Sequence, residues 1–265
     1  MQEPDDEGDE DGGDAETDHG VPFPGEPVAP ERRTDAWSTL PRGQPVDWKA
    51  LFGRDDAPRV VDLGCGNGRY LLGSALARPT HDHLGMDLVP QAVKHAARRA
   101  GERGLANLRF AWGDAMDLVF VGLAPGTLDE LHVYHPQPYY DPRDAHRRML
   151  SPAFFARAWA VLKPGSGRLV LQTDNPYYWD YVAHIAPRFF RWRNLQGPWP
   201  DAPAGRSRRE IFARSRGLAI FRGEGTPRAI NPRRVKTIAR HLPPPRFDAN
   251  RPKFRSGPPH PRSDS

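Results

Sequence analysis

The segment at residues 59–70, RVVDLGCGNGRY, constrains the fold of this chain more than any other stretch. Its apolar, β-favouring run at 60–63 predicts a buried strand. Three glycines then let the backbone turn sharply and approach a ligand without an intervening Cβ; they are Gly64, Gly66 and Gly68. Their G-x-G-x-G spacing differs from the G-x-G-x-x-G of dinucleotide-binding turns. We therefore predict a strand, a ligand-facing turn and the start of a helix.

Acidic residues end three predicted strands in succession. Asp62 ends the first, Asp87 ends the run at 83–87, and Asp114 follows the run at 107–112. In Rossmann-type units an acid at the end of the second strand holds ribose hydroxyls. Asp87 and Asp114 can also cap the helices that follow them, a role compatible with ligand binding. Because ligands of such folds bind beyond the carboxyl ends of the strands, the three acids mark a candidate ligand site.

Segments that predict strands alternate with segments that predict helices along the chain. The predicted strands cover residues 59–63, 83–87, 107–112, 127–135, 167–173, 189–192 and 218–221. The predicted helices cover residues 46–52, 69–77, 90–103, 151–162 and 176–186. This order predicts a three-layer α/β sandwich with a mostly parallel, seven-stranded sheet.

Charge is distributed unevenly along the chain. Its 265 residues carry 38 Lys and Arg against 33 Asp and Glu, a formal charge of +5. Residues 1–19 hold ten of the acids and no Lys or Arg, so the remainder carries 38 basic against 23 acidic residues. A folded part this basic indicates a polyanionic partner such as nucleic acid. The alternative is a solvated, arginine-rich surface without such a partner.

Composition also predicts the domain boundaries. Residues 1–33 are acidic and then rich in Pro and Gly, so we expect a disordered tail. Residues 34–230 hold the predicted strands and form one domain. Residues 231–265 are basic and proline-rich, and we expect a second disordered tail that adds nonspecific affinity for RNA.

The sequence argues against several other classes of protein. Cys65 is the single cysteine, so an internal disulfide and a cysteine zinc site are excluded. The ten His show no metal-ligand spacing, so no metal is expected. No apolar run approaches a membrane span of about 20 residues, and the acidic N-terminus is unlike a secretory signal. We expect a cytoplasmic enzyme that is a monomer or a homodimer.

The loop after the predicted fourth strand carries the most specific motif. Residues 132–150 read HVYHPQPYYDPRDAHRRML, followed by SPAFF at 151–155 and LKPG at 162–165. A strand ending in Thr173-Asp174 and the segment SRRE at 207–210 come next. With the glycine turn and the three acids, these segments resemble the class I S-adenosylmethionine methyltransferases, and within them the tRNA (guanine-N7)-methyltransferases of the bacterial TrmB type. The resemblance runs from about residue 58 to 223.

The resemblance implies a Rossmann-like fold of that class, S-adenosyl-L-methionine as cofactor and tRNA as partner. It implies methyl transfer to N7 of guanine, at position 46 of the tRNA variable loop. The cofactor-binding residues that it implies are Asp62, Gly64, Gly66, Gly68, Asp87 and Asp114. The substrate-binding residues that it implies are Asp141, Arg147, Arg148, Asp174, Ser207 and Glu210.

Two positions depart from the family pattern. Gln137 stands where the family has its catalytic aspartate, and Asp141 stands where it has a substrate-binding lysine. Guanine N7 is an unprotonated acceptor that needs no general base, so alignment of the reacting atoms carries much of the catalysis. A Gln carbonyl accepts a hydrogen bond from guanine but adds no negative charge, a loss of about 1–2 kcal/mol. We expect Gln137 to serve in a slower enzyme or with a shifted substrate.

Two other functions remain open from the sequence. One is a methyltransferase for another nucleic acid or a small-molecule amine, since Gln137-Pro138-Tyr139 loosely resembles the x-Pro-Pro-Tyr loop of exocyclic-amine methyltransferases. The other is a noncatalytic protein that binds RNA or the cofactor, because the acid at 137 and the lysine at 141 are absent. Nucleoside analysis of a methylated product separates the first from guanine-N7 transfer. The second predicts RNA binding without any methyl transfer.

Overall fold

The strands assemble into a single sheet in the computed structural model, which describes residues 16–249. From edge to edge its eight strands are β3 (Trp37–Ser38), β6 (Leu108–Trp112), β5 (Asp82–Asp87), β4 (Arg59–Leu63), β7 (Glu130–Tyr134), β8 (Arg168–Thr173), β10 (Phe221–Pro227) and β9 (Phe190–Leu195). The first six run parallel, and the last two are antiparallel to their neighbours. The mostly parallel α/β sheet predicted from the sequence is confirmed.

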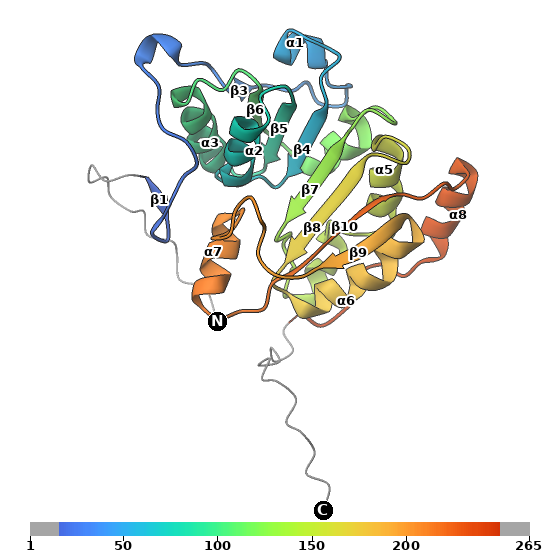
Figure 1. The fold of residues 1–265 in the computed structure, drawn as a ribbon. Coiled ribbons are helices and arrows are strands. Elements are labelled where there is room, and N and C mark those ends of the chain that lie inside the picture. Colours follow the sequence, from blue (N-terminus) through green and yellow to red (C-terminus); the bar gives the residue numbers. More distant parts are fainter. Residues whose placement is uncertain (1–15, 250–265) are drawn as a thin grey trace, which may run out of the picture.

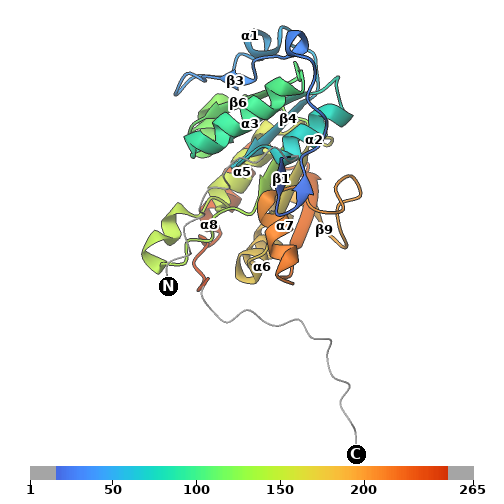
Figure 2. The ribbon, with the colours of Figure 1, turned by 90° about the vertical axis from the view of Figure 1, so that its left-hand side faces the viewer.

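Helices cover both faces of this sheet, as Figures 1 and 2 show, with α2 and α3 on one face and α5, α6 and α8 on the other. The α-helices are α1 (Trp48–Phe52), α2 (Arg69–Ala77), α3 (Pro90–Glu102), α4 (Ala115–Asp117), α5 (Pro152–Val161), α6 (Pro176–Ile185), α7 (Arg208–Ser215) and α8 (Pro232–His241). Shorter elements are the hairpin β1 (Thr17–Asp18) and β2 (Val21–Pro22), the 3-10 helices η1 (Pro30–Arg32), η3 (Pro142–Arg147) and η4 (Ala186–Arg188), and the π-helix η2 (Leu118–Gly122).

Each face of the sheet has its own hydrophobic core. Alternate residues of a strand point to opposite faces, so Val61 of β4 joins the core under α5 and α6, while Val60 joins the core under α2 and α3. Both side chains are fully buried. The central strands are therefore apolar on both faces, which is the pattern that marked them in the sequence.

The segments at both ends of the predicted domain are structured, which corrects the expected boundaries at residues 33 and 231. In the N-terminal segment Phe23 is buried, and the buried carboxylate of Asp18 pairs with Arg69 of α2 at 3.2 Å. In the C-terminal segment Val235 is buried where α8 packs on α5. Burial of apolar side chains accounts for this order despite the polar composition. The rest of both expected tails lies outside the described residues.

Two strands differ from their predictions. The strand β3 was not among the seven that were predicted. It has two residues and lies at the edge of the sheet, where it pairs with β6. The strand predicted at 218–221 lies instead at 221–227 as β10. The sequence pattern did not predict this strand in full because its glycines lower β propensity. The packing nevertheless requires glycine there. A Cβ on Gly223 would lie 2.7 Å from the Trp192 ring.

Within residues 16–249, no helix combines the length and the apolar character needed to cross a membrane.

Candidate active site

A cavity of about 710 Å³ opens at the carboxyl ends of β4 and β7. Its floor is the glycine turn between β4 and α2, and its opposite wall is the segment 206–216, which contains α7. His19 of the N-terminal hairpin completes the rim, with its ring 5.4 Å from that of Phe212. The cavity thus lies where ligands of parallel α/β sheets bind.

Asp62 presents a buried and unsatisfied carboxylate to this cavity. The residue is 2% exposed, and its Oδ1 has no hydrogen-bond partner among the described residues. Burial, with the nearby charge of Asp87, raises the pKa of Asp62 well above its ordinary value. A buried acceptor without a partner is costly, so the site favours a ligand that brings a donor or a cation.

The glycine turn has two distinct structural requirements. Gly64 and Gly66 line the cavity at φ of 74° and 53°, and a Cβ at either position would point into open space. Gly68 is required for packing, because a Cβ there would lie 2.6 Å from the Phe110 ring. The amide of Gly66 donates to Oδ2 of Asp87 at 2.8 Å, which holds the turn against the end of β5.

The two other predicted cofactor acids lie outside the lining of the cavity. Asp87 accepts from Gly66 and, through Oδ1, from the amide of Val89 at 2.9 Å. Asp114 caps α4 by accepting from the amide of Met116 at 2.8 Å. Asp114 therefore has the capping role that the sequence allowed, whereas Asp87 bonds the glycine turn and the amide of Val89 without capping α3.

Arg206 forms a cationic wall of the cavity. Its guanidinium lies 3.8 Å from the centre of the Trp199 ring and donates to the hydroxyl of Tyr134 at 2.9 Å. Asp201 pairs with it at 2.7 Å. Burial alone would lower the pKa of Arg206, but the surrounding Tyr134, Tyr70 and Asp201 raise it, so the charge is firmly retained.

Ser207 and Glu210 form the N-terminal cap of α7. The hydroxyl of Ser207 accepts from the amide of Glu210 at 3.1 Å, and the carboxylate of Glu210 accepts from the amide of Arg206 at 2.9 Å. Glu210 is fully buried, and its other oxygen accepts from Arg214 and Arg222. Glu210 therefore anchors this wall from behind, whereas Ser207 lines the cavity.

Asp174 stands beside the cavity with two donors fixed on it. His135, which lines the cavity, lies 3.1 Å away through Nδ1, and Arg209 pairs with the other carboxylate oxygen at 3.0 Å. Burial would raise the pKa of Asp174, but the bond from His135 and the charge of Arg209 hold it below its ordinary value. The site thus keeps one anionic group with a fixed orientation.

The loop that carries Gln137 is exposed. Gln137 makes no hydrogen bond within residues 16–249, and Tyr139 adopts a left-handed φ of 45° beneath the guanidinium of Arg147, 4.8 Å from its ring centre. Asp141 caps η3 and pairs with Arg143 at 2.6 Å. The hydrogen bonds from Arg143 lower the pKa of Asp141 to about 2. Gln137, Tyr139 and Arg147 are all accessible to a large substrate.

Arg148, which the resemblance placed among the substrate-binding residues, is instead enclosed by the protein. It is 3% exposed, and its donors bond the carbonyls of Pro138, Tyr139, Pro245 and Phe247 at 2.6 to 2.9 Å. The guanidinium also lies 3.9 Å from the centre of the Phe247 ring. These contacts argue against phosphate binding by Arg148 and make it a clamp between the Gln137 loop and the C-terminal segment.

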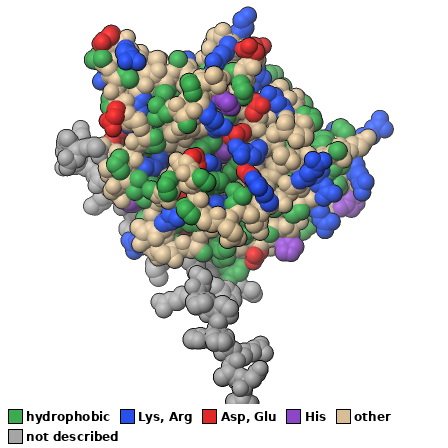
Figure 3. Space-filling model, in the orientation of Figure 1, with side chains coloured by type: hydrophobic (Ala, Val, Ile, Leu, Met, Phe, Trp, Pro, Cys, Tyr) green, Lys and Arg blue, Asp and Glu red, His purple; other side chains and the backbone are tan. Residues whose placement is uncertain are grey.

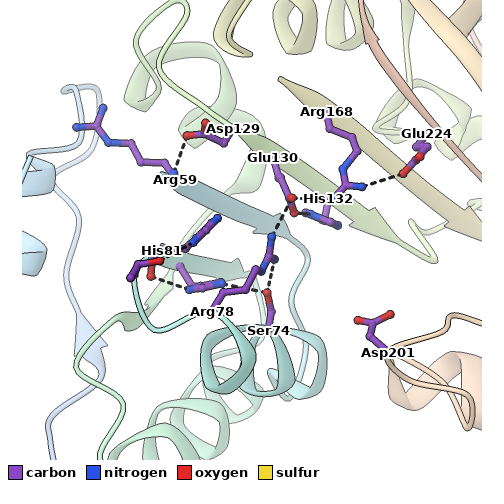
Figure 4. Close-up of polar contacts among 12 residues, drawn as sticks. Arg59, Ser74, Arg78, His81, Asp129, Glu130, His132, Arg168, Asp201 and Glu224 are labelled. Atoms are coloured by element: carbon purple, nitrogen blue, oxygen red, sulfur yellow. Dashed lines mark hydrogen bonds and ion pairs between the residues drawn. The ribbon is translucent and has the colours of Figure 1, made fainter. Parts of the chain in front are cut away.

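A buried polar network supports the cavity from the sheet, as Figure 4 shows. Glu130 of β7 pairs with Arg78 at 2.8 Å and with Arg168 at 2.6 Å, and it bonds His132 at 2.8 Å. His132 also contacts the hydroxyl of Tyr70, which lines the cavity. Burial lowers the pKa of His132 to about 4, so its imidazole is neutral near pH 7.

The structure brings together part of the predicted site and adds further residues. Of the predicted residues, those that line the cavity are Asp62, Gly64, Gly66 and Ser207. The cavity residues that sequence reasoning missed include His19, Tyr70, Tyr134 and Phe212. Arg206, next to the SRRE segment, was expected only near the phosphates of the substrate, and it lines the cavity. Among the described residues no group of three or more His, Cys, Asp or Glu could hold a metal ion.

Comparisons with known proteins give a consistent assignment. A family model described as a putative methyltransferase matches residues 56–211. A tRNA (guanine-N(7)-)-methyltransferase of Halorhodospira halophila is 35% identical over 179 residues, which cover 68% of this chain and 77% of that protein. A protein of the same name from Ralstonia nicotianae is 37% identical over 140 residues, which cover 53% of this chain and 54% of that protein.

The chain spans about half the length of most of these curated relatives. Among solved structures, the crystal structure of the 16S rRNA methyltransferase KamB is similar with a TM-score of 0.51 and 20% identity. The match covers 69% of this chain and 94% of that one, and it concerns the fold.

Proposed function

Because the chain belongs to the tRNA (guanine-N7)-methyltransferase family, we propose that it transfers a methyl group from S-adenosylmethionine to N7 of a guanine in tRNA. The observation that carries this proposal is the buried Asp62, which lines a cavity floored by a glycine turn and whose Oδ1 has no partner among the described residues. The proposed substrate implies a cytoplasmic enzyme.

The residues of the cavity, and two acids at the neighbouring strand ends, fit this cofactor. Asp62 offers a buried carboxylate to its amino group, and Gly64 and Gly66 leave room for its methionine part. Asp87, at the end of β5, would hold the ribose hydroxyls, and Asp114 would receive the adenine amine. When bound, S-adenosylmethionine supplies a methyl group activated on a sulfonium.

The chain needs to position the guanine more than to activate it. N7 attacks with an in-plane lone pair and carries no proton to remove, so no general base is required. Asp174, oriented by His135 and Arg209, is the fixed carboxylate beside the cavity. We assign to Asp174 the anionic charge that Gln137 lacks, since a carboxylate stabilises the cationic product. Gln137 and Tyr139 would then contact the base or its neighbours from the exposed loop.

The test is methyl transfer from labelled S-adenosylmethionine to an unmodified tRNA transcript, followed by nucleoside analysis. We expect N7-methylguanosine from the wild type and a faster reaction from Gln137→Asp, by about tenfold if a charge-assisted bond is gained. Asp62→Asn is the matched control, because it removes the cofactor contact and leaves the Gln137 loop unchanged.

The other outcomes assign other functions. Label on an exocyclic amine would indicate a different methyl acceptor. Activity in Gln137→Asp alone would indicate a family member that has lost catalysis. Binding of tRNA and cofactor without transfer by either protein would contradict the proposal.

A further inference from the structure

The helix α8 displays four cations that have no ion-pair partner among the described residues. Arg233, Arg234, Lys236 and Arg240 are exposed, and the helix itself, PRRVKTIARH, contains no acid. Within residues 16–249 none of the four forms an ion pair. Figure 3 shows Lys and Arg gathered at the right-hand edge of the molecule, where Figure 1 places α8.

This row is held rigidly on the folded domain. Val235 is 3% exposed, and Ile238 and Leu242 pack against the core beneath it. Asn231 caps the helix by accepting from the amide of Arg233 at 2.9 Å. The cations therefore occupy fixed positions on a surface, unlike charges on a flexible tail.

Folding does not account for these charges. Arg233 and Arg234 lie in the first turn of α8, where the helix dipole disfavours cations. Some arginines of the neighbouring strands have acidic partners: Arg168 pairs with Glu130 and Glu224, and Arg193 pairs with Glu224. On α8, four cations lie close together without such compensation from the described residues, which costs some stability and suits a polyanionic partner.

The surface is also connected to the candidate active site. The chain continues from α8 to Pro245 and Phe247, whose carbonyls accept from Arg148. Arg148 bonds in turn to Pro138 and Tyr139, next to Gln137. Arg148 thus joins the segment that follows α8 to the loop that carries Gln137.

We propose that α8 binds the phosphate backbone of the same RNA whose guanine enters the cavity. This inference rests on the proposed function for the identity of the RNA. Four fixed cations along about 10 Å of helix match a polyanion, and release of its counterions supplies the affinity. An anionic membrane fits less well, because the apolar side of α8 faces α5 and leaves no side chain to insert.

The test compares two variants that each lose four positive charges. One carries Arg233→Gln, Arg234→Gln, Lys236→Gln and Arg240→Gln. The matched control carries Arg32→Gln, Arg33→Gln, Arg42→Gln and Lys49→Gln, all exposed positions near the opposite edge of the sheet. Binding of an unmodified tRNA transcript is measured over a salt series, together with kcat, KM for tRNA and cofactor affinity.

We expect the α8 variant to bind tRNA about 10- to 100-fold more weakly and its salt slope to fall by about 3–4, since each of the four lost phosphate contacts contributes about 0.7–0.9. KM for tRNA should rise while kcat and cofactor affinity stay unchanged, and the control should resemble the wild type. Equal losses in both variants, or none in the α8 variant, would overturn the inference. So would loss of binding to phosphatidylserine vesicles with tRNA affinity intact.

Failure of the proposed function gives a different result. If the wild type binds tRNA but methylates nothing, the proposed function fails, while weaker tRNA binding by the α8 variant alone still supports the docking surface. If the wild type methylates tRNA and the α8 variant keeps its KM, the docking surface is wrong and the proposed function stands.

Discussion

The Nδ1 atom of His135 lies 3.1 Å from Oδ1 of Asp174, and the contacts on the other side of the ring determine which nitrogen carries the proton. Trp199 donates its indole N–H to Oε1 of Gln172 at 2.6 Å, so the amide nitrogen of Gln172 faces His135. That nitrogen donates to Nε2 of His135 at 2.9 Å. Nε2 therefore carries no hydrogen and accepts this bond, while the Nδ1–H group donates to Asp174. Gln172 fixes the tautomer that orients the carboxylate.

This relationship predicts different outcomes for two similar substitutions. His135→Asn keeps an N–H near the position of Nδ1, whereas His135→Gln moves the amide towards the position of Nε2. We expect His135→Gln to lower kcat about tenfold, the effect of about one lost hydrogen bond, and His135→Asn to lower it less. Steady-state kinetics with tRNA check this, and cofactor affinity should not change. Equal losses in both variants would contradict a role of Nδ1–H in orienting Asp174.

Asp62 should stabilise the bound cofactor at the expense of the empty protein. Its raised pKa means that the folded state disfavours the ionised carboxylate, so stability is lost as the pH rises through the folded-state pKa. Asp62→Asn removes that charge, and we expect the apparent Tm of the cofactor-free protein at pH 8 to rise by about 2–6 °C. Cofactor affinity should fall in the same variant. Differential scanning fluorimetry and calorimetric titration measure the two effects, and a lower Tm at pH 8 would contradict the first.

Two buried histidines should make the fold sensitive to mild acid. Burial lowers the pKa of His83 to about 3 and that of His132 to about 4, against an ordinary value of 6.5. The unfolded chain therefore binds up to two more protons than the folded protein between about pH 4 and 6.5, and stability falls as the pH drops. With two protons taken up, the free energy of unfolding falls by at most about 2.7 kcal/mol for each pH unit. Urea unfolding at pH 7, 6 and 5 measures it.

A single substitution provides the control for this pH dependence. His83 bonds the hydroxyl of Ser74 and the carbonyl of His81, and it has no contact with the cavity. His83→Gln should lower stability at every pH but reduce the slope by about one proton. An unchanged slope in this variant would show that His83 does not titrate as inferred.

Much of the fold was predictable because local signals agreed with the final structure. The apolar run before Gly64 and the cap at Ser151, which accepts from the amide of Phe154 at 3.2 Å, are set by neighbours in sequence. The same holds for α2, whose predicted and observed bounds coincide at residues 69–77. In contrast, α8 was concealed by its basic, proline-rich surroundings. Its core-facing side chains follow i, i+3, i+4, i+7 spacing at the buried Val235 and the partly buried Ile238, Ala239 and Leu242, the last of which follows the helix directly.

The candidate site was less predictable because burial depends on distant residues. Arg147 and Arg148 are adjacent and chemically identical, yet one is exposed and the other is a buried clamp. The difference comes from carbonyls of Pro245 and Phe247, almost 100 positions away in the chain. Glu210 likewise reads as a surface acid next to arginines, and its burial depends on β10. The sequence shows directly which residues are charged. Whether a charged side chain is exposed depends on segments that are distant in the sequence.

The clamp at Arg148 predicts that the C-terminal segment supports catalysis from outside the cavity. Arg148→Lys keeps the charge but cannot bond four carbonyls at once, so we expect the Gln137 loop to loosen and kcat to fall about tenfold or more. Truncation after Leu242, which removes Pro245 and Phe247, should produce a similar loss in kcat. Cofactor affinity should persist in both variants, because the glycine turn and Asp62 are untouched. Arg147→Lys is the matched control and should mainly raise KM for tRNA. A truncated protein with full kcat would contradict the clamp.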